Sequence, residues 1–211
     1  MNGILGGIAF LFKGGFVMYP LLASGLVALT VIIERLLVLN KKLHTAPEEI
    51  RSVIKKAQAG EVDVALSEAQ KGNSPIMKVI AVGLGDKSGS SEDLELKMKV
   101  EAEGWLPVIE KRMQIIDTII TAAPLMGLLG TITGMMGSFQ VLSDKGVNEP
   151  NAITGGVAEA LIATATGLVI ALLCLVAFNY LNQKIKNIIA EMEGAASNVL
   201  SIKKSLQRVK S

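Results

Sequence analysis

The sequence predicts an all-α membrane protein with three transmembrane helices and long helical extensions outside the bilayer. The first reason is composition: half of the 211 residues are hydrophobic and the mean hydropathy is +0.48, values typical of membrane proteins. The second reason is that the apolar residues form three blocks, each long enough for the roughly 20 residues of helix that cross a hydrocarbon core.

The basic residues orient the parts of the chain. Between Asn40 and Asp117 there are 12 Lys and Arg, and six follow Leu181, whereas the link after the second block has only Lys145. Lys and Arg concentrate on the cytoplasmic side of a membrane. The predicted parts are an interfacial segment (1–14), a first transmembrane span (15–39), a cytoplasmic helical domain (40–114), a second span (115–142), an external link (143–151), a third span (152–181) and a cytoplasmic C-terminal helix (182–211).

Helix signals are clear between the first two spans. Pro47 followed by acids, Ser74 before Pro75, and Ser90 before acids each predict a helix start. From about Pro107 the helical pattern runs into the second span, so one continuous rod is expected there. The tail also keeps helical spacing, and we expect it to extend the third span.

The composition argues against several function classes. With a net charge of +2 and no basic strip, nucleic acid is not an expected partner. The single cysteine, Cys174, has no partner in its own chain for a disulfide. An intramembrane protease needs a Ser/His pair, paired aspartates or a metal cluster, and the one histidine, His44, lies beyond the first span. The sequence therefore predicts no enzyme, no cofactor and no metal site.

The third apolar block carries one acidic residue, Glu159. A charged group at membrane depth costs roughly 2.5–3.5 kcal/mol on insertion scales and normally faces a bundle interior or a hydrated path. Two interpretations are open: Glu159 is an ion or proton site, or it is an interfacial acid whose carboxylate reaches the outer headgroups. An acid together with hydroxyls on an adjacent span favours the ion site.

Three threonines are candidates for the same pathway. Thr166 follows Glu159 by seven residues and lies on nearly the same face of an ideal helix, whereas Thr164 is rotated from Glu159 by about 140°. Thr131 lies near the middle of the second span. A hydroxyl in a span more often bonds a carbonyl of its own helix than a ligand, so each threonine alone is weak evidence.

Small residues follow one face of the second span and one face of the third. Such stripes allow transmembrane helices to approach closely, so they predict packing between spans. The stripe residues are Gly127, Gly130, Gly134 and Gly137 in the second span and Gly156, Ala160, Ala163 and Gly167 in the third.

A resemblance to the MotA/TolQ/ExbB family of ion-channel proteins rests on two motifs in this order, "TAAPLMGLLGTITGMMGSF" and "GGVAEALIATATGL". The first span also resembles that of the family, in "MYPLLASGLVALTVIIERL". The three-span layout, with a large segment between the first two spans, is similar to the TolQ and ExbB branch rather than to four-span MotA. The match covers nearly the whole membrane portion.

The resemblance implies a homopentamer in the bacterial inner membrane, with the N-terminus and the external link in the periplasm. Its second and third spans would line a central pore around a dimeric single-span partner similar to ExbD or TolR. The family's pore glutamate falls on Glu159 and its two threonines on Thr131 and Thr164; Thr166 is added from helix geometry. The implied function is that of a motor or stator subunit, driven by the ion-motive force, that couples ion flow to mechanical work on the cell envelope.

The sequence departs from the family pattern in the third span. Leu172 and Leu173 stand where many relatives have a proline, and Thr166 stands where an apolar residue is common. Protons are the favoured ion. An extra hydroxyl near the acid suits Na⁺ as well, because hard cations prefer oxygen ligands. The alternative function is a structural membrane scaffold without ion conduction.

Overall fold

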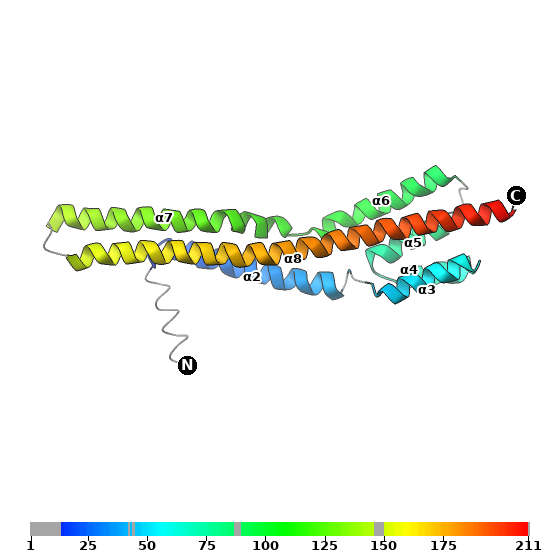
Figure 1. The fold of residues 1–211 in the computed structure, drawn as a ribbon, viewed down its shortest axis with the longest axis horizontal. Helices are drawn as coiled ribbons and strands as arrows, with labels where there is room; N and C mark the ends of the chain where they lie inside the picture. The colour runs from blue at the N-terminus through cyan, green and yellow to red at the C-terminus, as the bar shows by residue number, and fades with distance from the viewer. Residues whose placement is uncertain (1–13, 42, 44, 87–89, 146–149, 211) are drawn as a thin grey trace, which may run out of the picture. The chain divides into compact units, whose positions relative to one another are not determined.

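The computed structural model describes residues 14–41, 43, 45–86, 90–145 and 150–210. Within these ranges the regular structure is helical, which confirms the all-α prediction (Figure 1). The helices are α2 (Met18–Lys41), α3 (Pro47–Gln58), α4 (Val62–Lys71), α5 (Pro75–Gly85), α6 (Ser91–Ile109), α7 (Met113–Lys145) and α8 (Pro150–Lys210). The predicted interfacial segment lies outside the described residues except for Gly14.

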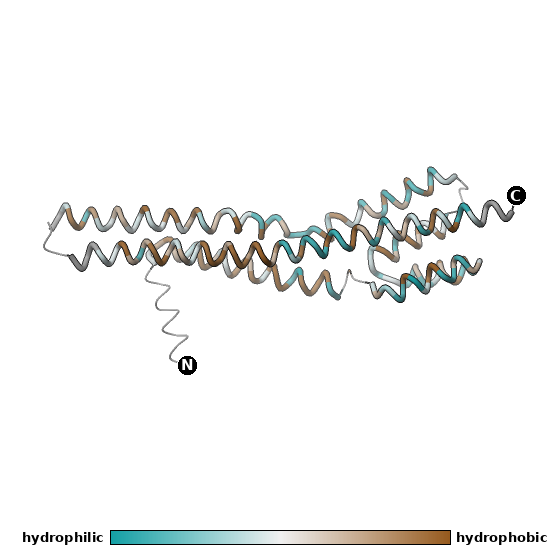
Figure 2. Tube along the Cα trace, in the orientation of Figure 1, coloured by the Kyte–Doolittle hydropathy of each residue, from teal (hydrophilic) through white to brown (hydrophobic). Residues whose placement is uncertain are grey.

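Three of these helices, α2, α7 and α8, are long and apolar enough to cross a membrane, so the prediction of three spans is confirmed. Figure 2 shows the apolar stretches along each of them. Between 22% and 28% of the most apolar window of each helix is buried within the chain. Most of the apolar surface of the spans is therefore left for lipid or for other protein chains.

The chain folds into two compact units, and each unit is built from two separate segments. Unit 1 contains the described residues 14–33 and Arg112–Tyr180, and unit 2 contains Glu34–Lys111 and Leu181–Ser211. Helices α2 and α8 contribute to both units. Unit 1 thus contains most of the apolar length of the spans, and unit 2 contains α3 to α6 with the second half of α8.

The helices of unit 2 begin where the sequence signals predict. Pro47 stands in the first turn of α3. The Ser74 hydroxyl accepts a hydrogen bond from the Met77 N–H at 3.4 Å, and the Ser90 hydroxyl accepts one from the Asp93 N–H at 3.4 Å. The C-terminal half of α8 buries one side, which includes Leu181, Ile185, Ile188, Met192, Ala195, Val199 and Ile202. The tail therefore continues the third span as one helix, as predicted.

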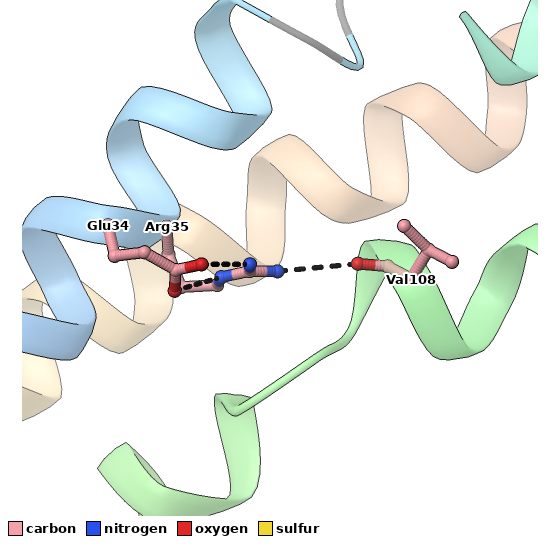
Figure 3. A network of polar contacts seen from close by, with 3 residues as sticks. All are labelled: Glu34, Arg35 and Val108. Carbon is pink, nitrogen blue, oxygen red and sulfur yellow. Dashed lines mark hydrogen bonds and ion pairs between the residues drawn. The ribbon is translucent and has the colours of Figure 1, made fainter.

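The expected continuous rod from Pro107 into the second span is wrong. Helix α6 ends at Ile109 and α7 begins at Met113, with Arg112 between them at a φ of 63°. In an unbroken helix the carbonyl of Val108 would accept the Arg112 N–H. In the structure this carbonyl instead accepts a hydrogen bond from the Arg35 guanidinium at 3.3 Å (Figure 3).

The Arg35 side chain is itself held by its sequence neighbour. Its Nε and Nη2 donate to the two carboxylate oxygens of Glu34 at 2.9 and 2.7 Å (Figure 3). Arg35 is 2% exposed, and a buried guanidinium needs a charge partner and hydrogen-bond acceptors. A side chain from α2 therefore caps the end of α6, which a local sequence pattern does not reveal.

Candidate functional site

Helices α7 and α8 are in backbone contact along their small residues in unit 1. A Cβ placed on Gly167 would lie 2.5 Å from the carbonyl oxygen of Ala123, and one placed on Gly134 would lie 2.8 Å from that of Gly156. A Cβ on Gly130 would collide with the Cβ of Ala163. Only residues with little or no side chain allow the two helix backbones to lie this close together. This is the close approach that small-residue stripes permit in membranes.

The last residue of the predicted stripe on α7, Gly137, does not lie at the contact with α8. Gly137 is exposed, and a Cβ added to it would meet no atom of the described residues within 4 Å. Ser138 is the residue that continues the contact: it is 5% exposed, its hydroxyl donates to the carbonyl of Gly134 at 3.1 Å, and it lies against Gly156. Its spacing of four residues from Gly134 is the sequence signal that could have found it.

Thr164 connects the two helices through a hydrogen bond. Its hydroxyl donates to the carbonyl of Gly127 on α7 at 3.0 Å. A Cβ on Gly127 would lie 3.0 Å from the Cα of Thr164, so the backbones are adjacent at this level. The bond therefore crosses the contact between α7 and α8 at a point where a glycine allows it.

The hydroxyls of Thr131 and Thr166 bond within their own helices. Thr131 donates to the carbonyl of Leu128 at 2.6 Å, and Thr166 donates to that of Ile162 at 2.8 Å. All three site threonines thus give their hydroxyl proton to a backbone carbonyl. A hydroxyl oxygen that donates in this way keeps its lone pairs, so each oxygen can still accept a hydrogen bond or contact a cation.

Glu159 is half-buried and lies beside the start of α2. A Cβ placed on Gly15 would lie 2.8 Å from the carboxyl carbon of Glu159 and would overlap its Oε1. Further along the same flank of α8, Ile170 contacts Gly25 of α2, because a Cβ on Gly25 would lie 3.2 Å from the Cδ1 of Ile170. The carboxylate is therefore on the α2 side of α8.

Glu159 and Thr164 occupy two different flanks of α8. Glu159 faces α2, whereas Thr164 faces α7, as expected from the rotation of about 140° between them. The structure brings Glu159 together with Gly15 and Thr164 together with Gly127. Gly15 was missed by sequence reasoning, since a glycine before an apolar run carries no signal of its partner.

A comparison with family models decides what kind of protein this is. Residues 32–194 match the model of the MotA/TolQ/ExbB proton channel family. The chain belongs to this family. The matched range includes Glu159, Thr131, Thr164 and Thr166 and all of the small-residue stripes, whereas Gly15 and Gly25 of the α2 side lie before it.

Named relatives place the chain in the TolQ/ExbB branch of the MotA/TolQ/ExbB family. It is 31% identical over 168 residues to an ExbB-like protein of Synechocystis sp. described as a biopolymer transport protein, covering 79% of this chain and 80% of the relative. It is 34% identical over 118 residues to the biopolymer transport protein ExbB of Aquifex aeolicus, covering 54% and 76%. It is 27% identical over 187 residues to the Tol-Pal system protein TolQ of Haemophilus influenzae, covering 80% and 78%.

Proposed function

We propose that the chain is a subunit of an inner-membrane motor that uses the ion-motive force to do mechanical work on the cell envelope. The observation that carries the proposal is Glu159, the one acid of α8 before Glu191, half-buried against α2 in a chain of a proton channel family. An acid at this depth is costly unless it faces a hydrated path or a partner. Relatives described as a biopolymer transport protein and as a Tol-Pal system protein support an energy-transducing role.

The proposed assembly is a homopentamer around a dimeric single-span protein similar to ExbD or TolR. The proposal is supported by the large apolar surface that α7 and α8 leave exposed within one chain. Single apolar residues scattered over a surface are common, but a continuous apolar surface of this kind marks a contact with lipid or with other proteins. The residues of this surface include Leu125, Leu128, Ile132 and Met136 on α7 and Leu161, Leu168, Leu172 and Val176 on α8. Neighbouring copies, the partner helices and lipid would divide this surface between them.

The proposed work cycle uses the charge state of Glu159. A proton that moves down the membrane potential releases about 2.3 kcal/mol per 100 mV. Transfer of that proton to or from Glu159 would change the charge of this half-buried side chain and hence the subunit that the partner helices prefer. The oxygens of Thr131, Thr164 and Thr166 provide hydrogen-bond acceptors along the way, because their protons are already given to carbonyls.

The alternative is a membrane scaffold without ion conduction, which the backbone contact between α7 and α8 favours. Glu159→Gln decides between the two, with Glu191→Gln as the control because Glu191 is exposed on the same helix. We expect Glu159→Gln to reach wild-type levels in the membrane but to leave a deletion strain without envelope function, whereas Glu191→Gln restores function. If Glu159→Gln complements the strain fully, the motor proposal is wrong and the scaffold stands.

The same strain also identifies the ion. We favour protons, so wild-type complementation should persist in sodium-free medium and disappear when a protonophore collapses the proton gradient. Loss of function in sodium-free medium, with restoration by added Na⁺, would instead assign Na⁺ and give the extra hydroxyl of Thr166 a role as an oxygen ligand.

A further inference from the structure

The glycine next to the proposed ion-pathway acid is constrained in two ways. Gly15 has a φ of +77°, a region that residues with a Cβ adopt only at a cost. A Cβ at this position would also overlap the Glu159 carboxylate. Either constraint alone would favour glycine, and the second one concerns the acid itself.

The position of Gly15 is set by its surroundings in unit 1. Its carbonyl accepts a hydrogen bond from the Met18 N–H at 3.1 Å, which closes the turn that begins α2. The neighbouring Gly14 is buried, and a Cβ on it would lie 3.2 Å from the Cγ2 of Ile162, one turn after Glu159 on α8. The turn is therefore packed against the same flank of α8 that carries the carboxylate.

We propose that Gly15 is a positioning residue for Glu159: the bare backbone of the turn forms one wall of the carboxylate site and directs the carboxylate along the α2 flank of α8. The proposal rests on the proposed function, because it matters only if Glu159 handles the ion. A methyl group at Gly15 would fill the space of Oε1 and force the Glu159 side chain into another rotamer. Glu159 would then still be present, but its carboxylate would be displaced.

The test compares three alanine variants of the full-length chain in host membranes. Gly15→Ala adds the methyl group at the carboxylate. Gly60→Ala adds the same backbone strain where φ is +88° and no described atom lies within 4 Å. Gly14→Ala adds a methyl group to the same turn, but against Met18 and Ile162 rather than against Glu159. Complementation and the labelling of Glu159 by a hydrophobic carbodiimide, counted by mass spectrometry, are measured per amount of protein in the membrane.

We expect Gly15→Ala to lower activity about tenfold, since a displacement of about 1 Å at a reacting group can cost up to about 10²-fold. Labelling of Glu159 should change at the same time by more than about threefold, whereas Gly14→Ala and Gly60→Ala leave labelling near the wild-type level. A loss of packing alone would lower the amount of protein without moving the labelling of the remaining molecules. If Gly15→Ala labels and complements like Gly60→Ala, the positioning role is wrong.

A second pair of variants covers the case in which Gly15→Ala does not accumulate. Glu159→Ala removes the carboxylate that the methyl group would meet, so Gly15→Ala with Glu159→Ala should accumulate like Glu159→Ala alone. If this double variant is also absent from the membrane, the contact with Glu159 is not the cause and the proposal fails. Failure of the motor proposal is distinguishable, because it shows as full activity of Glu159→Gln whatever the Gly15 variants do.

Discussion

Thr164 and Thr166 lie two residues apart on α8, yet their hydroxyls have different partners. Thr164 bonds to Gly127 on α7, whereas Thr166 bonds to Ile162 within α8. Loss of the first bond weakens the contact between two helices, while loss of the second leaves a carbonyl that still has its own helical partner. The two residues therefore offer a matched comparison between packing and local bonding.

Thr164→Val should destabilise the protein, because valine has a similar shape but cannot donate to Gly127. Interhelical hydrogen bonds in membranes contribute about 0.6 kcal/mol on average and up to about 1.7 kcal/mol, so we expect a loss in this range. Thr166→Val should change stability by less. Thermal unfolding in detergent, followed by the circular dichroism of the helices, measures both, and equal losses for the two variants would contradict the assignment of the interhelical bond.

Helix geometry and the family resemblance predicted different parts of the site. Geometry alone placed Thr166 on the side of Glu159 and rotated Thr164 away from it, and the structure has Thr164 directed to α7. The partner of Thr164 depends on the register between α7 and α8, which one sequence does not state. The role proposed for Gly15 could not be predicted from the sequence. It depends on a contact with Glu159, which lies about 140 residues later in the chain.

The contact between α7 and α8 is the element on which unit 1 depends. The small residues of this contact were visible as stripes in the sequence. The sequence did not show which of them lie at the contact, since Ser138 rather than Gly137 continues it. The break between α6 and α7 was missed for a similar reason. It is stabilised by Arg35, a residue of α2 that lies 73 positions before Val108 in the sequence.

Gly167→Ala and Gly137→Ala should have opposite effects on stability, because only Gly167 lies at this contact. At Gly167 the new methyl group would lie 2.5 Å from a backbone oxygen of Ala123, which cannot move as a flexible side chain can. Overpacking of this kind costs about 1–3 kcal/mol. At Gly137 the methyl group meets open space, and alanine favours a helix over glycine by up to about 1 kcal/mol.

The amount of folded protein in membranes and its unfolding temperature in detergent test both variants. Gly167→Ala should lower the two quantities, and Gly137→Ala should leave them unchanged or raise them in the isolated chain. Because Gly137 is exposed, a loss caused by Gly137→Ala only in the assembled complex would place that glycine at a contact with another chain. A Gly167→Ala variant as stable as the wild type would show that the helices are further apart than described.

At the scale of the whole chain, two units share two helices. The sequence predicted the three spans and the helical segment between them because hydropathy and helix-start signals are local properties. The number of copies in the proposed assembly and the proposed partner are not local properties, since they depend on which exposed faces of α2, α7 and α8 meet other chains. The apolar surface of the spans shows that such contacts or lipid must cover them.

The orientation of the whole chain is a prediction from its charges, and single cysteines test it. Cys174 is buried and is first replaced by alanine, after which a cysteine is placed at Ser143, near the end of α7, or at Gln70, in unit 2; both positions are exposed. The basic residues between the first two spans and in the tail predict that unit 2 lies in the cytoplasm. A membrane-impermeant maleimide should therefore label Ser143→Cys on intact spheroplasts and Gln70→Cys only after lysis. Labelling of Gln70→Cys on intact spheroplasts would show that the predicted orientation is wrong. Protons would then cross the proposed motor in the opposite direction relative to the chain.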